Sequence, residues 1–270
     1  MNETKNILVT GGAGLIGTIL IDHLNDQYNF SSIDINETKG AKSYIGDLSD
    51  LDAIQPAFEK QDIVIHLAAD PSPESSWQSN LTNNLIATYN VYEAAKRAGV
   101  KRVIFASSNH AQGGNYLSKP WSLIMEGKFS SLEHGQYPLV LETDMIRPDG
   151  YYGTSKAFGE AIGSYYYDYF GLKSIHLRIG WVISVDEPNF SPMILSLWLS
   201  HRDAVHAFKL AIEAPDSIGN EIFAVTSDNK WKIFSIDKAR TLLQYNPLDG
   251  AGEEYISGNP PARNLYHYPR

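Results

Sequence analysis

The chain has 270 residues, of which 43% are hydrophobic, and a formal net charge of -9 at pH 7. This length suits one large domain with its own core, and the acidic balance argues against a nucleic-acid partner, which would require a basic face. The absence of cysteine excludes disulfides and thiolate chemistry, and no metal site is predicted. Neither a signal peptide nor an apolar run of about 18 residues is found, so we expect a cytoplasmic protein with no membrane partner.

Short runs rich in β-branched residues alternate with segments of helical periodicity over the first 180 residues. The predicted strands are Asn6–Thr10, Phe30–Asp34, Ser43–Ile45, Asp62–Leu67, Arg102–Ser107 and Ser174–Ile179. The predicted helices are Leu15–Leu24, Leu51–Phe58, Asn80–Ala98 and Tyr151–Phe170, the last two ending before a glycine suited to a left-handed cap. Repeated strand and helix predict a parallel sheet covered on both faces, the α/β class.

The regular alternation ends at Gly180. Beyond it we predict loops, one strand at Ile222–Thr226 and one helix at Ile236–Leu243, and therefore two parts: residues 1–180 as a nucleotide-binding domain and residues 181–270 as a small substrate-binding lobe packed on it. Residues 111–148 lack clear periodicity, which inside a compact domain is typical of a functional loop or lid.

A glycine-rich turn, Gly12-Ala13-Gly14-Leu15-Ile16-Gly17, directly follows the first predicted strand and opens the first helix, and Gly11 precedes it. Glycines there allow backbone N–H groups at a helix N-terminus to approach a pyrophosphate closely. Asp34 ends the second strand, where a carboxylate can accept hydrogen bonds from a ribose and repels a 2'-phosphate. Together these features predict a doubly wound Rossmann fold that binds NAD in preference to NADP.

Other residues follow the ends of later strands, at the edge where open α/β sheets bind ligands. Asp47 and Leu48 follow the third strand, and Leu67, Ala68 and Ala69 lie at the end of the fourth, so all five are predicted to bind the cofactor, together with Gly11, Gly14, Leu15, Ile16, Gly17, Asp34, Tyr152 and Lys156. His66, in the same region, is interpreted as a core histidine with satisfied hydrogen bonds.

Tyr152 and Lys156 are four residues apart at the start of a predicted helix, so they share one helix face. A neighbouring ammonium favours the phenolate and lowers a tyrosine pKa below its usual value of about 10, which makes Tyr152 a candidate general base. Ser108, at the end of the fifth strand, can hydrogen-bond the hydroxyl that Tyr152 deprotonates. Tyr151 is expected to pack or to contact substrate.

In this order, TGGAGLIG, the strand-end Asp34, SSN and YGTSK resemble the extended short-chain dehydrogenase/reductase family over nearly the whole chain, including the final LQYNP. The resemblance implies that Ser108, Tyr152 and Lys156 are the catalytic residues. It also implies that Asn84 supports the lysine through water and belongs to the cofactor-binding residues.

The segments FASSNH, RPDGYYGTSK, LRIG and LWLSHRD look most like uronate dehydrogenases and the related NAD-dependent glucose-6-phosphate dehydrogenases, and DPSPESSW favours the sugar-phosphate side. This resemblance implies NAD-dependent oxidation of the anomeric C1 hydroxyl of a sugar, sugar phosphate or uronate to a lactone, with Tyr152 as general base. The substrate-binding residues it implies are Ser72, Ser108, Asn109, His110, Tyr152 and Arg202.

The chain departs from uronate dehydrogenases at Met193, where those enzymes hold the sugar carboxylate with an arginine. A guanidinium is the usual partner of a carboxylate or phosphate, so a neutral aldose or a differently held anion becomes plausible. Arg202 is one replacement, although it could equally be a surface residue paired with Asp203. Trp181 stands where uronate enzymes have a small polar residue, which again indicates a different pocket.

Two other functions use the same motifs. The first is an NDP-sugar 4-epimerase or dehydratase with tightly bound NAD, against which the short C-terminal lobe argues. The second is a non-catalytic NAD-binding sensor, a class that generally loses the tyrosine or lysine that this chain keeps. The resemblance also implies a homodimer or higher homo-oligomer through the Asn80 and Tyr151 helices.

Overall fold

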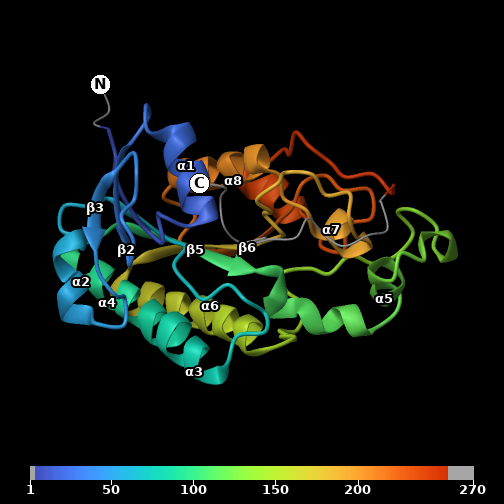
Figure 1. The fold of residues 1–270 in the computed structure, drawn as a ribbon, viewed down its shortest axis with the longest axis horizontal. Helices are drawn as coiled ribbons and strands as arrows, with labels where there is room; N and C mark the ends of the chain where they lie inside the picture. Colours follow the sequence, from blue (N-terminus) through green and yellow to red (C-terminus); the bar gives the residue numbers. More distant parts are fainter. Residues whose placement is uncertain (1–3, 255–270) are drawn as a thin grey trace.

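The computed structural model describes residues 4–254, and its centre is a seven-stranded parallel sheet in the order β3-β2-β1-β4-β5-β6-β7 (Figure 1). The strands are β1 Asn6–Thr10, β2 Asn29–Asp34, β3 Lys42–Ile45, β4 Ile63–His66, β5 Arg102–Ser108, β6 Lys173–Ile179 and β7 Asn220–Val225. The order reverses direction between β1 and β4, where doubly wound folds bind ligands. The predicted fold class is confirmed, and all six strands predicted before Gly180 are present.

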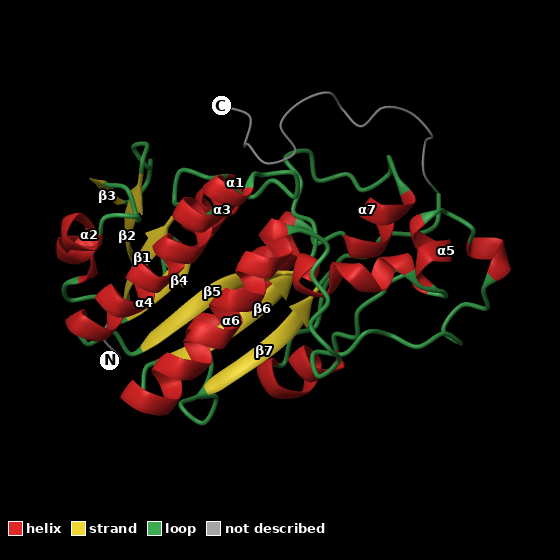
Figure 2. Ribbon diagram, turned by 90° about the horizontal axis from the view of Figure 1, so that it is seen from below, coloured by secondary structure: helices red, strands yellow, loops and turns green. Residues whose placement is uncertain are grey.

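Helices cover both faces of this sheet, and the central strands β4 and β5 are therefore buried throughout. One face is covered by α1 (Leu15–Leu24) and α8 (His201–Glu213), and the other by α2 (Leu51–Phe58), α4 (Ala87–Ala98) and α6 (Tyr151–Phe170) (Figures 1 and 2). The helices α4 and α6 end at Gly99 and Gly171, whose φ angles of 72° and 70° are the left-handed caps predicted from the sequence.

The helix predicted at Asn80–Ala98 ends at Ala98 as expected, but it starts earlier and is not α-helical throughout. It begins one turn earlier as α3 (Trp77–Asn80), where the Ser76 hydroxyl accepts a hydrogen bond from the backbone N–H of Ser79. A π-helical segment, Leu81–Ile86, then connects α3 to α4. Such wide turns are rare and frequently occur at functional sites.

The chain after Gly180 contains two helices that we did not predict, α7 (Pro192–Leu197) and α8. The sequence carried the signal for α8: Ser200 caps its first turn, and the buried Ala204, Ala207, Phe208 and Ala211 recur at helical spacing. The predicted helix Ile236–Leu243 is present from Asp237 onward, and its last five residues, Ala239–Leu243, form a π-helical turn.

The proposed boundary at residue 180 does not separate two cores. Strand β7 pairs with β6 in the main sheet, and Phe223 and Val225 share a core cluster with Ile175 and Leu177. The division into a nucleotide-binding and a substrate-binding part therefore stays a prediction about function. Residues 255–270 of the predicted lobe lie outside the described residues.

Residues 111–148 extend beyond the carboxyl ends of the strands, beside α7 (Figure 2). They complete a 3-10 stretch (Asn109–Leu117) and continue through α5 (Trp121–Met125) and a second 3-10 turn (Phe129–Ser131). Buried Ile124 and Val140 hold this segment against an apolar cluster that contains Trp231 and Phe234. The segment predicted as a loop or lid is thus anchored by its own hydrophobic contacts.

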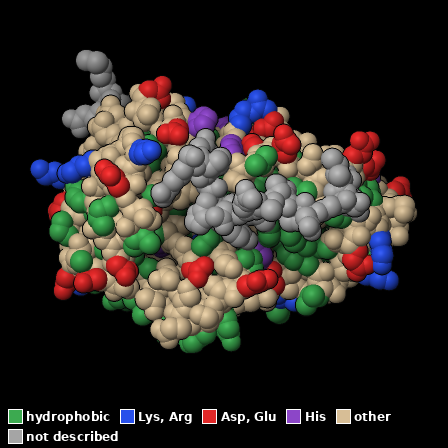
Figure 3. All heavy atoms as spheres, viewed as in Figure 1, with side chains coloured by type: hydrophobic (Ala, Val, Ile, Leu, Met, Phe, Trp, Pro, Cys, Tyr) green, Lys and Arg blue, Asp and Glu red, His purple; other side chains and the backbone are tan. Residues whose placement is uncertain are grey.

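Acidic and basic side chains are interspersed on the face shown in Figure 3. Exposed ion pairs such as Lys128 with Glu126 each contribute little to stability in water. Within residues 4–254, none of the helices combines the length and apolar character needed to cross a membrane.

Candidate functional site

A cavity of about 500 Å³ lies at the carboxyl edge of the sheet. It is lined by nearly all of the predicted cofactor-binding residues: Gly11, Gly14, Leu15, Ile16, Gly17, Asp34, Asp47, Leu48, Leu67, Ala68, Ala69, Tyr152 and Lys156. They come from loops far apart in the sequence, which the parallel strands bring to one edge. Their roles in binding stay predictions.

The cavity also has lining residues that the sequence interpretation missed. Ile35 and Asn36 follow Asp34, and Asp70 and Pro71 follow Ala69, so extending the strand-end rule by two residues would have found them. No sequence signal identified Asn83, which the π-helical segment contributes. The others are Ala13, Ile33, Gly46, Ala87, Ala106, Ile179 and Val182.

The glycine-rich turn is packed too tightly for a side chain at Gly11 or Gly17. A Cβ on Gly17 would lie 2.5 Å from the carbonyl oxygen of Gly11, and one on Gly11 would lie 2.7 Å from the backbone nitrogen of Ala68. Gly11 also has a φ of 75°, a conformation that favours glycine. The turn therefore leaves its backbone exposed to the cavity, as close approach of a dinucleotide pyrophosphate requires.

Asp34 stands at the end of β2 beside this turn. Its two carboxylate oxygens accept hydrogen bonds from the backbone N–H of Ala13 (3.1 Å) and of Asn36 (2.9 Å). These bonds fix the carboxylate at the cavity wall, where an ionised group can accept further bonds from ribose hydroxyls. The residues present thus fit a dinucleotide.

His66 ends β4 close to the cavity but takes part in core packing. Its two ring nitrogens lie 2.7 Å from Thr10 Oγ1 and 3.0 Å from Thr88 Oγ1, and the residue is 1% exposed. Burial lowers the pKa of His66 to about 3, which keeps the ring neutral. The interpretation as a satisfied core histidine is confirmed.

Tyr152 and Lys156 lie on one face of α6 and both line the cavity. The Lys156 ammonium nitrogen is 5.4 Å from the centre of the Tyr152 ring and donates a hydrogen bond of 2.8 Å to the carbonyl oxygen of Ala106 on β5. Lys156 is fully enclosed, and this burial lowers its pKa from 10.5 to about 7. Its charge is therefore costly unless a negative group lies nearby.

We expect the buried lysine to make stability depend on pH. Between about pH 7 and pH 10.5 the unfolded chain keeps the Lys156 proton that the folded chain has lost, so the free energy of unfolding rises with pH. Lys156→Met should abolish this contribution, which is at most about 1.4 kcal/mol per pH unit for one proton. Urea unfolding without cofactor at about pH 7 and pH 9 measures the difference, with exposed Lys39→Met as control. If the free energy of unfolding changed equally between these two pH values in the wild type and in Lys156→Met, the expectation would be contradicted.

Ser108, Asn109 and His110 form one hydrogen-bonded turn at the end of β5. The Ser108 hydroxyl accepts a bond of 3.2 Å from the backbone N–H of His110, and the Asn109 amide donates one of 2.8 Å to the hydroxyl of Tyr116. The His110 ring packs edge-on against Tyr152, with 5.5 Å between ring centres. The structure thus places this turn next to Tyr152, although none of the three residues lines the 500 Å³ cavity.

Asn84 is buried behind the cavity, in the π-helical segment. Its side-chain oxygen accepts a bond of 2.7 Å from the backbone of Asp70, and its nitrogen lies 3.1 Å from the hydroxyl of Ser155, the residue before Lys156. Ser72 takes part in a local turn, accepting a bond from the backbone of Glu74 (3.2 Å), and does not line the cavity. The predicted roles of Asn84 and Ser72 stay predictions.

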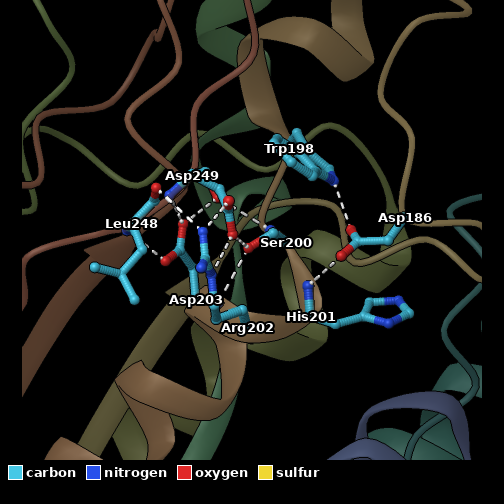
Figure 4. A network of polar contacts seen from close by, with 9 residues as sticks. Asp186, Trp198, Ser200, His201, Arg202, Asp203, Leu248 and Asp249 are labelled. Atoms are coloured by element: carbon cyan, nitrogen blue, oxygen red, sulfur yellow. Dashed lines mark hydrogen bonds and ion pairs between the residues drawn. The ribbon is translucent and has the colours of Figure 1, made fainter.

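Arg202 does not pair with Asp203, as one interpretation suggested. Its guanidinium forms a two-pronged ion pair with Asp249, and its side chain is 60% exposed (Figure 4). Asp203 is fully buried and accepts hydrogen bonds from the backbone of Leu248 (2.7 Å) and the hydroxyl of Ser227 (2.6 Å). Arg202 is not among the cavity-lining residues.

Met193 packs in the apolar clusters that also contain Trp181. The Trp181 ring is 6.1 Å from that of His110, which connects these clusters to the turn beside Tyr152. Across the described residues, no group of three or more acidic or histidine side chains is arranged to hold a metal ion.

Comparisons with known proteins support a dinucleotide site. The L-arabinose 1-dehydrogenase (NAD(P)(+)) of Haloferax volcanii is 36% identical over 258 residues, which cover 91% of this chain and 97% of that protein. The NAD-dependent glucose-6-phosphate dehydrogenase of the same organism is 34% identical, over 94% of this chain and 97% of that protein. A mutant uronate dehydrogenase from Agrobacterium tumefaciens, solved with NAD, is 30% identical with a TM-score of 0.76, covering 92% of this chain and 86% of that one.

A model of the NAD dependent epimerase/dehydratase family matches residues 7–201, which include the glycine-rich turn, Asp34, Ser108, Tyr152 and Lys156. The resemblance drawn from the motifs is confirmed at the level of the family. The chain belongs to the NAD dependent epimerase/dehydratase family, and its cofactor is NAD.

Proposed function

We propose that this chain is an NAD-dependent sugar dehydrogenase that oxidises the anomeric C1 hydroxyl of a cyclic sugar to a lactone. The observation that carries the proposal is the placement of Tyr152 and buried Lys156 on the wall of the cavity that fits the dinucleotide, beside the turn of Ser108 to His110. Three dehydrogenases, named for L-arabinose, glucose 6-phosphate and a uronate, are relatives over about nine-tenths of the chain.

In the proposed reaction, NAD when bound supplies the acceptor for the hydride that leaves C1. Ser108 holds the C1 hydroxyl, and Tyr152 takes its proton as the carbon–oxygen double bond of the lactone forms. When it is protonated, Lys156 favours the phenolate that this step requires, because its ammonium nitrogen lies 5.4 Å from the centre of the Tyr152 ring. The protein thereby supplies orientation and a path for one proton.

We further propose a neutral aldose as the preferred substrate. Met193, where uronate dehydrogenases carry an arginine, packs among apolar side chains, and Arg202 is held by Asp249. Neither position supplies a free cation beside Tyr152, and an anion desolvated without a cationic partner binds poorly.

The test is NADH formation by purified protein with L-arabinose, other free aldoses, galacturonate, glucuronate and glucose 6-phosphate. We expect turnover with NAD and a kcat/KM at least about tenfold higher for a neutral aldose than for either anionic class, equivalent to about 1.4 kcal/mol. Higher activity with a uronate or a sugar phosphate would reject the neutral substrate but keep the dehydrogenase. No turnover across the panel, with NAD retained through purification, would favour the epimerase or the sensor.

Asp34 is expected to select NAD over NADP. Asp34→Asn preserves the shape of the side chain but removes the charge that repels a 2'-phosphate, so the ratio of kcat/KM for NAD to that for NADP should fall about tenfold. Asp47→Asn is the matched control, because Asp47 also lines the cavity as an acid after a strand and should leave the ratio unchanged. An unchanged ratio in Asp34→Asn would contradict the proposal.

We also propose a homodimer formed through α4 and α6. Their outer surface exposes Tyr89, Tyr165, Tyr169 and Phe170, between 45% and 74% each, and the Tyr165 ring contacts those of Tyr169 and Phe170. Exposed aromatic surface of this kind is typical of an interface. Light scattering should report a dimer that Tyr169→Glu weakens, whereas Leu117→Glu, at an exposed residue elsewhere, should not. A monomeric wild type would refute this proposal.

The absence of cysteine keeps the cytoplasm as the proposed location.

A further inference from the structure

His110 and Asp149 form a hydrogen-bonded pair that joins the two segments carrying the proposed catalytic groups. His110 follows Ser108 at the end of β5, and Asp149 lies just before α6, which begins with Tyr151 and Tyr152. The Nδ1 atom of His110 is 2.7 Å from a carboxylate oxygen of Asp149, and the two side chains are only 11% and 26% exposed. The sequence motifs gave no reason to single out Asp149.

Two glycines enclose this pair. A Cβ on Gly113 would lie 2.1 Å from the Asp149 carboxylate, and a Cβ on Gly153 would lie 2.2 Å from the carbonyl oxygen of His110. Any side chain at either position would force the pair apart. The packing therefore holds both residues in one arrangement, as precise positioning of a polar group requires.

The contact with Asp149 determines which kind of hydrogen bond the other ring nitrogen of His110, Nε2, can form. An ionised carboxylate only accepts hydrogen bonds, so the proton of a neutral His110 ring resides on Nδ1, and Nε2 is left as an acceptor. The ring lies between Tyr152 (5.5 Å) and Trp181 (6.1 Å), measured between ring centres. An acceptor next to Tyr152 suits a sugar hydroxyl beside the one at C1, because a hydroxyl can donate to it.

We propose that Asp149 is a positioning residue, which fixes the orientation and tautomer of His110 so that Nε2 accepts a hydrogen bond from a sugar hydroxyl adjacent to C1. This inference rests on the proposed function, since it assigns the substrate contact of the same site. Asp149 itself touches neither the sugar nor NAD, so its loss should affect sugar binding more than cofactor binding.

Steady-state kinetics of Asp149→Ala, His110→Ala and the double variant test whether Asp149 and His110 act together. With the sugar that the wild type oxidises best, among L-arabinose, galacturonate and glucose 6-phosphate, Asp149→Ala should raise the sugar KM about tenfold and change the NAD KM less than about twofold. The double variant should be no worse than His110→Ala, because residues that act as a unit are not additive. Asp149→Asn, which keeps an acceptor oxygen, should recover part of the loss. Asp144→Ala is the control, since its carboxylate bonds the backbone of Leu141 in the same loop.

The tautomer is measured independently of activity by long-range ¹H–¹⁵N spectra of protein labelled at histidine, with the His110 signals identified by their loss in His110→Gln. A proton on Nδ1 in the wild type and a mixture of tautomers in Asp149→Ala support the inference. The same tautomer in both proteins, or fully additive effects on KM, would overturn it. If the wild type oxidises none of the sugars, the proposed function fails, and the tautomer alone then decides whether Asp149 positions His110.

Discussion

Tyr152→Phe will reduce the rate of NADH formation by a factor of about 10² to 10⁴ while NAD binding changes little. The substitution removes one hydroxyl from a residue that lines the cavity, and with it the acceptor for the C1 proton. Lys156 stays in place, because its hydrogen bond goes to the carbonyl oxygen of Ala106. Single-turnover kinetics with saturating NAD and sugar give the rate, and fluorescence titration gives the affinity for NADH.

Tyr151→Phe is the matched control for this experiment. Tyr151 is the preceding residue, 54% exposed, and its ring packs against Trp77 with 5.6 Å between centres. We expect the loss of the Tyr151 hydroxyl to change the rate of NADH formation less than about twofold. A Tyr152→Phe enzyme that kept more than about a tenth of wild-type activity would remove the residue from the role of general base.

Glu160→Gln will lower the free energy of unfolding by about 3–5 kcal/mol. Glu160 lies one turn after Lys156 on α6 and forms a two-pronged ion pair with Arg178 of β6, with both side chains at most 2% exposed. It also accepts a bond of 2.6 Å from the hydroxyl of Ser107. Neutralising one partner leaves the other charge buried without compensation, which costs far more than the pair contributes.

Urea unfolding of Glu160→Gln and of the control Glu126→Gln measures this difference. The Glu126 pair with Lys128 is exposed, so its loss should cost no more than about 1 kcal/mol. Similar small losses of unfolding free energy in both variants would show that the fold does not depend on the buried pair. Because Glu160 connects the helix of Tyr152 to β5 and β6, we also expect lower activity in the folded fraction of Glu160→Gln.

Local patterns predicted the elements whose formation depends on neighbouring residues. The helices Leu15–Leu24, Leu51–Phe58 and Tyr151–Phe170 have the predicted bounds, since apolar spacing, and in the last helix the terminal Gly171, act within a few turns. The helix α8 was missed although its own capping serine and apolar face were visible in the sequence. The π-helical segment around Asn84 carries no comparable local signal, because side-chain bonds to Asp70 and Ser155 hold it.

The sequence by itself determined the fold class, and nearly all of the residues that it predicted to bind the cofactor line the cavity, because parallel strands place whatever follows their ends at one edge. It also singled out Tyr152 and Lys156, whose spacing of four residues acts within one helix. Only the tertiary structure decided what the side chains between these motifs do: that Arg202 binds Asp249, that Met193 lies among apolar residues, and that Asp149 meets His110. Asp149 and His110 are 39 residues apart, and chain folding alone brings them into contact.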